Sequence, residues 1–299
     1  MNAWQPLATT CELGGATEAP LTVIRPPQAA AATPLVFASP HSGRIYPQHM
    51  MAAARIDRDA IRRSEDAYVD TLIDDAPNHG ITVIAARLAR AYLDVNRGPW
   101  ELDPQMFEDE LPAFARTRTA RVAAGLGVIA RTVGEGGDIY ARKLTFAEAA
   151  ARIEAVHRPY HIALADLIAE GRERHGLAIL IDWHSMPAGA AQYAFGGAGC
   201  DMVLGDRFGA ACSPSVARLV EKQLQGLGYR VARNAPYAGG YTTEHYGRPA
   251  DRVHALQIEV NRALYLDEAA LSLTDGFAAL KRRLSPIFAT LAGVDWPSV

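Results

Sequence analysis

Polar residues that can bind a metal ion or move a proton lie at the ends of apolar segments in this chain. FASPHSGR ends one apolar run at His41, and LIDWHSMP ends another at His184. LDVNRGPW places Asn96 and Arg97 behind a third run, and LQIEVNR carries Glu259 just inside a fourth. In parallel α/β sheets, ligands bind at the edge where the carboxyl ends of the strands meet. If the runs are parallel strands, two histidines, a carboxylate and an arginine converge on that edge.

Two imidazoles and one carboxylate form a ligand set that suits a catalytic zinc ion, which keeps a further position open. The acidic ligand has to come from another segment, and RRSEDAYVD offers Glu65 and Asp66. We favour Asp66, with Glu65 as the alternative. Glu259 is costly to bury inside an apolar strand unless it has a partner. Beside a metal ion, it would act as a general base that takes a proton from water and passes it to the leaving nitrogen.

Each of these residues also has a structural interpretation. A single histidine at a strand end is more often a hydrogen-bonded structural residue than a metal ligand. Asp66 alone is typical of the first turn of a helix, where the macrodipole favours a carboxylate. Glu259 alone suits a buried ion pair with Arg262. Because His41 and His184 are both followed by serine at a strand end, the pair gives a metal site about the same weight as two unrelated structural residues.

The elements that must position these residues alternate along the chain. Apolar, β-branched runs predict strands at 21–25, 34–39, 81–88, 177–182, 229–234 and 255–260. Helical spacing predicts helices at 50–63, 67–76, 146–171 (kinked or split at Pro159), 215–226 and 266–291. This alternation predicts an α/β fold with a mostly parallel sheet covered by helices on both faces. We expect residues 1–33 to form a lead-in segment and residues 34–299 to form a single catalytic domain.

Composition excludes several classes of protein. The chain has 299 residues, of which 49% are hydrophobic, so it can bury a large core. Its formal charge is -3, and no block of Lys and Arg stands out, which argues against nucleic-acid binding. No apolar run approaches the roughly 18–20 residues that cross a bilayer. The three cysteines show no disulfide or metal spacing. We therefore expect a cytoplasmic monomer or small homo-oligomer with no membrane or nucleic-acid partner.

Eight segments together resemble one known family, the N-formylglutamate amidohydrolases. In chain order they are SPHSGRIYP, SEDAYVD, RAYLDVNRGP, RPYHIAL, DWHSMP, VLGDRFGAAC, NAPYAGGYTTEHYG and LQIEVNRALYL, and the resemblance covers roughly residues 34–285. The resemblance implies a zinc-dependent hydrolase that releases formate from N-formyl-L-glutamate late in histidine degradation. It also implies a fold similar to that of zinc carboxypeptidases and aspartoacylases, in which a mixed, mostly parallel sheet lies between helix layers.

Matching the segments residue by residue implies a complete site. It gives His41, Asp66 and His184 as zinc ligands and Glu259 as the base. The carboxypeptidase pattern places its acidic ligand three residues after the first histidine, and here Arg44 holds that position. The acidic ligand must therefore come from elsewhere, and the choice between the two acids of the SED segment stays open.

The implied substrate carries two carboxylates, so its pocket needs cationic groups, and arginine can bind a carboxylate with two parallel hydrogen bonds. We predict that Arg44 and Arg97 bind these carboxylates, with Asn96 beside them. The glycine-rich loop NAPYAGGYTTEHYG is predicted to cover the site and to offer Tyr241 and Thr243 as polar contacts.

Two other functions fit the same residues. One is a zinc hydrolase that acts on another N-acyl amino acid or a small peptide. The other is a metal-free binding protein for an acidic amino-acid derivative, although such a protein has no use for a base beside an open ligand position. Cobalt and manganese also suit a site of two histidines and one carboxylate.

Overall fold

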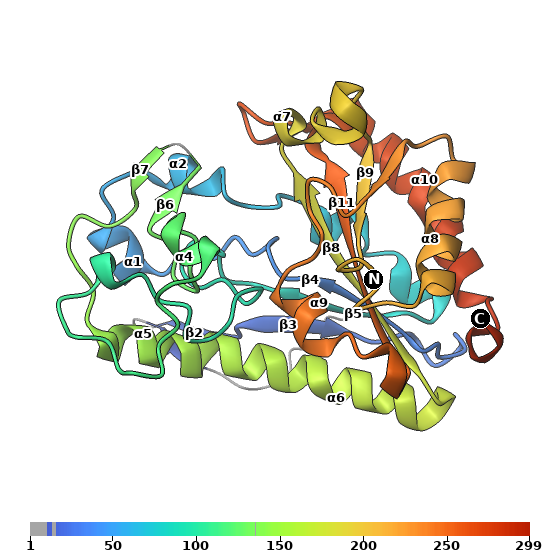
Figure 1. Ribbon diagram of the computed structural model, residues 1–299, viewed down its shortest axis with the longest axis horizontal. Coiled ribbons are helices and arrows are strands. Elements are labelled where there is room, and N and C mark those ends of the chain that lie inside the picture. The colour runs from blue at the N-terminus through green and yellow to red at the C-terminus, as the bar shows by residue number, and fades with distance from the viewer. Residues whose placement is uncertain (1–10, 14–15, 135) are drawn as a thin grey trace. The chain divides into compact units, whose positions relative to one another are not determined.

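The computed structural model describes residues 11–13, 16–134 and 136–299, and the chain divides into two compact units (Figure 1). The first unit holds the described residues up to Thr22 together with Pro40–Glu65 and Ala85–Ala163. The second unit holds Val23–Ser39, Asp66–Ile84 and Leu164–Val299. The assignment of residues 34–299 to a single catalytic domain stays a prediction.

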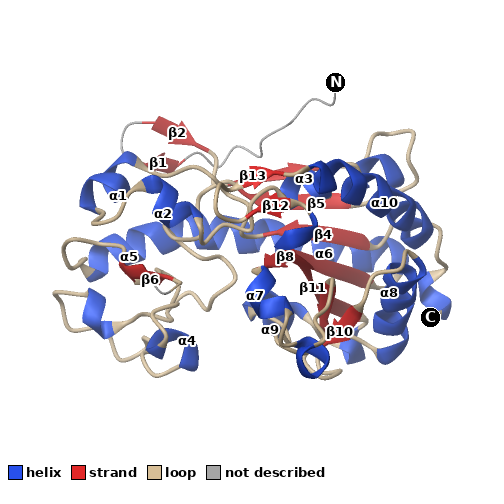
Figure 2. Cartoon of the chain, turned by 90° about the horizontal axis from the view of Figure 1, so that it is seen from above, coloured by secondary structure: helices blue, strands red, loops and turns tan. Residues whose placement is uncertain are grey.

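A seven-stranded sheet has the strand order β10-β9-β11-β8-β4-β5-β3 (Figure 2). Its strands are β3 (Leu21–Ile24), β4 (Leu35–Ser39), β5 (Thr82–Ala86), β8 (Ala178–Met186), β9 (Met202–Gly205), β10 (Val231–Arg233) and β11 (Val253–Asn261). Strands β4, β8 and β11 are parallel neighbours. β9 runs antiparallel to β11 and parallel to β10. The predicted α/β class with a mixed, mostly parallel sheet is confirmed.

Besides short 3-10 and π-helical segments, the described residues form three two-stranded sheets and ten α-helices. The small sheets pair β1 (Cys11–Leu13) with β2 (Ala16–Glu18), β6 (Thr132–Val133) with β7 (Gly136–Asp138), and β12 (Leu266–Asp267) with β13 (Ser272–Leu273). The helices are α1 (Gln48–Ala53), α2 (Arg58–Arg62), α3 (Val69–Leu72), α4 (Ala120–Ala123), α5 (Phe146–Arg152), α6 (Arg158–His175), α7 (Ala188–Ala191), α8 (Pro214–Gly226), α9 (Tyr241–Tyr246) and α10 (Asp275–Ala292).

The side chains of β8 alternate between two faces, as the period of a strand requires. On one face, Trp183 joins the core beneath α3, α8 and α10. Its ring lies 5.5 Å from the ring of Phe37 in β4, which in turn lies 5.2 Å from the ring of Phe288 in α10. Figure 1 shows α8 and α10 together on one side of β9 and β11. The residues before and after Trp183 therefore point to the other face of the sheet.

Several elements differ from the predicted ones. The helix predicted at 50–63 is divided into α1 and α2, and the one predicted at 67–76 is shortened to α3, followed by a 3-10 helix at Ala76–His79. Three further differences have a local reason. The helix predicted at 146–171 is not broken at Pro159. Instead, α5 and α6 are joined by a π-helical segment, Ile153–His157, which precedes the proline, a residue that has no N–H to donate. α10 begins at Asp275, because β12 and β13 form a hairpin before it. Strand β9 was not predicted, since only four apolar residues separate Asp201 from Asp206.

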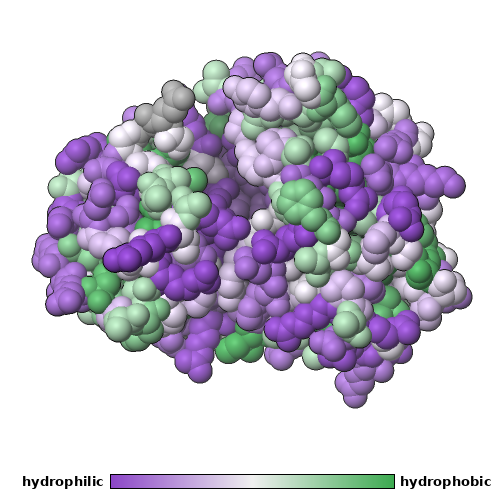
Figure 3. All heavy atoms as spheres, in the orientation of Figure 1, coloured by the Kyte–Doolittle hydropathy of each residue, from purple (hydrophilic) through white to green (hydrophobic). Residues whose placement is uncertain are grey.

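No helix among the described residues is long and apolar enough to span a membrane. The face of the molecule drawn in Figure 3 is mostly hydrophilic, and its apolar side chains are scattered between polar ones.

The loop that follows β4 is held against a second backbone segment of the first unit. The Ile45 N–H donates to the Arg87 carbonyl at 3.0 Å, and the Ala89 N–H donates to the Ile45 carbonyl at 3.0 Å. A Cβ atom built on Gly43 would lie 2.0 Å from the carbonyl oxygen of Leu88. Because that neighbour is backbone, it cannot rotate away, so the close approach of the two segments requires glycine.

We expect Gly43→Ala to push the two segments apart and to displace His41, which lies two residues before it. The overlap with the Leu88 carbonyl should lower the free energy of unfolding by about 1–3 kcal/mol, as other overpacked sites do. Urea denaturation measures this change. Gly189→Ala is the matched control, because a Cβ there meets no atom within 4 Å. Equal stability of the two variants would show that the loop tolerates a side chain at Gly43.

Candidate functional site

The parallel pairing of β8 and β11 places four polar side chains on one face of the sheet. In this register, His184 is the partner of Glu259 and Asp182 is the partner of Gln257. Registered partners in adjacent strands point to the same face, and so do residues two apart in one strand. All four side chains are buried, on the face opposite the Trp183 core. The sheet itself therefore brings the predicted ligand His184 next to the predicted base Glu259.

Asp66 lies against His184 and is held there by an arginine. The Asp66 Oδ2 atom is 3.0 Å from His184 Nδ1, and Asp66 Oδ1 accepts a hydrogen bond of 2.9 Å from Arg262 Nη2. The Nε of Arg262 also donates to the Ser185 hydroxyl at 3.1 Å. Arg262 and Asp66 thus form a buried ion pair.

His41 follows β4 directly and is buried against Asp94. The distance from His41 Nε2 to Asp94 Oδ1 is 2.7 Å, and the same carboxylate receives Arg90 Nη2 at 2.7 Å and the Asn96 N–H at 2.8 Å. Burial opposes ionisation of this carboxyl, but Arg90, His41 and Arg97 hold the pKa of Asp94 well below its usual range. Asp94 is therefore an ionised acceptor that fixes the orientation of the imidazole.

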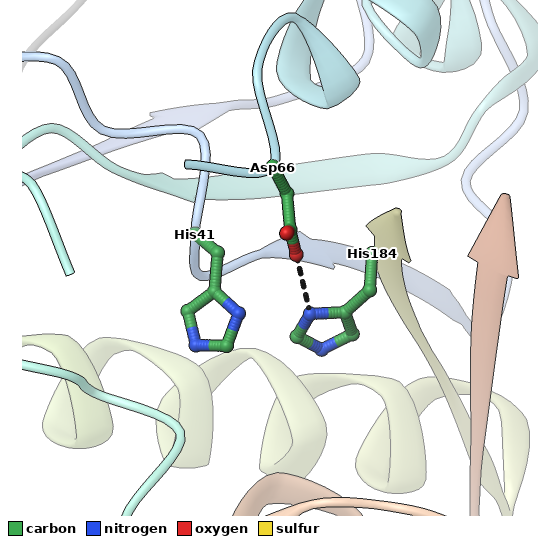
Figure 4. A group of neighbouring side chains, drawn as sticks. All are labelled: His41, Asp66 and His184. Carbon is green, nitrogen blue, oxygen red and sulfur yellow. Dashed lines mark hydrogen bonds and ion pairs between the residues drawn. The ribbon is translucent and has the colours of Figure 1, made fainter. Parts of the chain in front are cut away.

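His41, Asp66 and His184 come together as one buried group (Figure 4). Each offers a ligand atom, and these atoms all lie within 4.8 Å of one another. Asp94 occupies Nε2 of His41, and Asp182 lies 3.0 Å from Nε2 of His184. In each ring, Nδ1 is thus the nitrogen that does not contact these two carboxylates. Imidazole ligands of metals usually have such a carboxylate behind them.

The spacing and the charge of this group suit a divalent cation. Two ligands of one tetrahedral zinc ion at about 2.0–2.1 Å lie roughly 3.3 Å apart, close to the 3.0 Å between Asp66 and His184. Burial disfavours the imidazolium of His184. The carboxylates of Asp182, Asp66 and Glu259 nevertheless raise the pKa of His184 well above its usual value. Without a metal ion, the imidazole thus supplies the positive charge that the surrounding carboxylates need.

The two candidate acids of the SED segment have different partners. Asp66 belongs to the buried group. The neighbouring Glu65 accepts a hydrogen bond of 2.5 Å from the Tyr46 hydroxyl, and its Oε1 lies 3.3 Å from Arg62 Nε. These contacts tie Glu65 to its own unit and favour Asp66 as the acidic ligand.

Three of the residues predicted to bind substrate belong to the first unit. Arg44 is exposed, so its guanidinium is accessible to solvent. Asn96 is buried, and its N–H donates to the Asp94 carboxylate. Arg97 donates through Nε to the Leu126 carbonyl and through Nη1 to the Asn96 carbonyl. Those bonds fix the guanidinium of Arg97 and leave Nη2 as its remaining donor group.

The other two, Tyr241 and Thr243, lie on α9 in the second unit. The Tyr241 ring stacks on His245, with ring centroids 5.1 Å apart and planes 18° from parallel. The Thr243 hydroxyl donates to the Gly240 carbonyl at 2.9 Å and is fully buried. The Thr243 hydroxyl is thus used in a hydrogen bond at the first turn of α9, and the Tyr241 ring packs against His245 of the same helix.

Sequence reasoning assigned no role to three residues that contact the site. Asp182 and Gln257 each lie two positions before a predicted site residue, so strand alternation alone places them on the same face as His184 and Glu259. That spacing was the available signal. Asp94 gave none, because its partner His41 is 53 residues away in the chain.

Comparison with known proteins gives consistent matches over most of the chain. Residues 33–266 match the model of the family described as N-formylglutamate amidohydrolase. The N-formylglutamate deformylase of Pseudomonas aeruginosa is 30% identical over 241 residues, which cover 79% of this chain and 84% of that protein. The enzyme of the same name from Pseudomonas putida is 29% identical over 238 residues, covering 79% and 82%.

A solved structure gives the same result. The crystal structure of N-formylglutamate amidohydrolase from Ralstonia eutropha JMP134 superposes with a TM-score of 0.88 at 37% identity, and the match covers 94% of this chain and 100% of that one. Together with the sequence matches, it confirms the resemblance drawn from the eight segments.

Proposed function

This chain belongs to the N-formylglutamate amidohydrolase family, and we propose that it hydrolyses N-formyl-L-glutamate to formate and L-glutamate at a zinc ion. The proposal assigns His41, Asp66 and His184 as the zinc ligands and Glu259 as the general base. The observation that carries it is the buried group of two imidazoles and one carboxylate whose ligand atoms lie within 4.8 Å of one another. The reaction is the formate-releasing step late in histidine degradation.

The chemistry of the donor atoms supports zinc. Two imidazole nitrogens and one carboxylate oxygen leave a fourth position of a tetrahedral ion open, as catalytic zinc sites require. Asp94 and Asp182 accept from the far nitrogens of His41 and His184, which fixes both tautomers with Nδ1 as the ligand. A structural zinc site would instead be closed by a fourth protein ligand.

The residues around the zinc ion would carry out the proton transfers of hydrolysis. A bound zinc ion supplies Lewis acidity, which lowers the pKa of a water molecule to about 7 and stabilises negative charge on a carbonyl oxygen. Glu259, beside His184 on the same face of the sheet, accepts the proton of the attacking water. It then delivers that proton to the amide nitrogen, so that glutamate leaves as an amine. No covalent intermediate with the protein is needed.

The remaining predicted residues would select the substrate. Arg44 and Arg97 bind the two carboxylates of N-formylglutamate, and Asn96, Tyr241 and Thr243 supply further polar contacts. For Arg97, the fixed guanidinium and the remaining Nη2 donor support this role. A rigid donor binds a carboxylate with less loss of side-chain entropy than a mobile one.

The purified protein is expected to contain zinc and to release formate from N-formyl-L-glutamate. Chelation should abolish formate release, and added zinc should restore it, because the Lewis acid is returned to its ligands. His184→Ala removes one of three ligands and should lose both the bound zinc, measured by elemental analysis, and more than about 99% of the activity.

The matched control is His79→Ala, since His79 is hydrogen-bonded to Asp75 and Ser285 and does not belong to the ligand group. This variant should keep both zinc and activity. A His184→Ala variant that keeps both would contradict the metal assignment. Zinc without formate release in the native protein would instead point to another N-acyl amino acid or a small peptide as the substrate, and a metal-free native protein would point to binding without catalysis.

Asp182→Asn should weaken zinc binding by about 10–100-fold, because removing the carboxylate behind a ligating imidazole typically costs that much. The asparagine keeps the size and one acceptor oxygen, so the fold should be retained. Competition with a chromogenic chelator measures the affinity. Asp267→Asn, at an exposed turn that caps Ala269 and Ala270, is the control. Unchanged affinity would exclude Asp182 as the partner that orients His184.

Arg44→Ala is expected to raise KM for N-formyl-L-glutamate by about 10–100-fold, since a charged hydrogen bond is worth about 1.5–3 kcal/mol. kcat should change less, because Arg44 is assigned to binding. N-formyl-L-alanine has one carboxylate fewer, so its kinetics should be nearly insensitive if Arg44 binds the side-chain carboxylate. Arg58→Ala, an exposed neighbour whose guanidinium lies over Tyr46, is the control. An equal KM change for both substrates would assign Arg44 to the carboxylate they share.

A further inference from the structure

We propose that Gln257 is a positioning residue that holds the carboxylate of Glu259 in place for proton transfer. This inference rests on the proposed function, in which Glu259 is the general base. It gives a role to a residue that the sequence analysis left without one and that does not belong to the ligand group.

The contact between the two side chains is short and lies within one strand. Gln257 Nε2 donates to Glu259 Oε1 at 2.7 Å. The residues are two apart in β11, so both side chains project from the same face. Their relative exposures are 4% and 7%, so little water competes for this hydrogen bond. In such an environment a hydrogen bond to a charged group is strong.

The backbone beneath this pair is held from both sides. β11 pairs with β8 along one edge and with β9 along the other. On the β9 side, Gln257 is the register partner of Gly205, where an added Cβ would lie 2.7 Å from the carbonyl carbon of Ala238. The segment before α9 therefore crosses the sheet beside Gln257. Because β11 is paired on both sides in a fixed register, the position of the Gln257 amide relative to Glu259 is fixed as well.

The carbonyl oxygen of the Gln257 amide indicates that the glutamine has a role beyond packing. Gln257 Oε1 is buried and has no hydrogen-bond partner among the described residues. Such an unsatisfied acceptor costs about 1–3 kcal/mol, and an apolar residue of the same length would avoid that cost. What the apolar residue could not supply is the donor to Glu259. The hydrogen bond from Gln257 Nε2 to Glu259 therefore offsets the cost of the unsatisfied Oε1 atom.

An amide is suited to this task because it donates a hydrogen bond without carrying a charge. An arginine in the same place would form an ion pair with the base and weaken it as a proton acceptor. Without the Gln257 donor, Glu259 loses a hydrogen bond that restrains its two-fold terminal torsion. A displacement of about 1 Å at a reacting group can cost on the order of 100-fold in rate.

The test is a pair of variants in the zinc-loaded full-length protein. Gln257→Leu removes the donor and the orphaned acceptor together and should keep the fold, the zinc content and KM. kcat for N-formyl-L-glutamate should fall by about 10–100-fold. Gln257→Met has a more flexible side chain and serves as a second variant if leucine packs poorly. Gln225→Leu is the matched control. Gln225 donates to Glu221 at 3.4 Å on the exposed face of α8, so this substitution should leave kcat unchanged.

A double-mutant cycle separates positioning of Glu259 from a general structural effect. If Gln257 acts through Glu259, Gln257→Leu should cost less than about 3-fold in a Glu259→Gln background. An equal loss in both backgrounds, an unchanged kcat in Gln257→Leu and Gln257→Met, or loss of zinc from both variants would each overturn the inference. Failure of the proposed function shows elsewhere, in the native protein or in Glu259→Gln alone. Full activity of Glu259→Gln would overturn the base assignment and this inference with it.

Discussion

The parallel register between β8 and β11 is the constraint on which the rest of the site depends. It sets His184 opposite Glu259 and Asp182 opposite Gln257, and a shift by one residue would turn one strand's pair to the opposite face. Such a shift is costly because the alternate residues, Trp183 among them, fill the core beneath α3, α8 and α10. Packing on one face of the sheet thus fixes the chemistry on the other. The arrangement needs no loop to bring His184 of β8 and Glu259 of β11 together.

Charge compensation explains the partners of the buried acids. Each buried carboxylate is costly unless a cation or a donor meets it. Asp94 meets Arg90 and His41, and Asp66 meets Arg262 and His184. The imidazole of His184 serves Asp66 and Asp182 at once, and these acids, with Glu259, raise its pKa. A divalent cation bound among these residues would take over that positive charge, so its binding would be coupled to deprotonation of His184.

The sequence was most informative where function lies at strand ends. His41, His184 and Glu259 were predicted because the runs before them are long and apolar, and because parallel strands end at one edge. The choice between Glu65 and Asp66 was open, since neighbouring residues share every sequence signal. Their separate partners, Tyr46 for the first and Arg262 for the second, come only from tertiary structure. The same holds for β9, whose four residues are too short for a clear period.

Arg262 shows how the Asp66 side chain, supplied by a distant segment, is kept in position. Its guanidinium donates through Nη2 to Asp66 and through Nε to Ser185, the residue after His184. Arg262 itself follows the last residue of β11, Asn261. The guanidinium of Arg262 therefore links Asp66, which precedes α3, to Ser185 near the end of β8 and to the end of β11. Its fork geometry sets the distance between Asp66 and Ser185. Arg44, and not an acidic residue, lies three residues after His41, so the position of the Asp66 carboxylate depends on these hydrogen bonds and not on a short sequence spacing. The distance between Asp66 and His184 is then a property of the packed sheet end rather than of one motif.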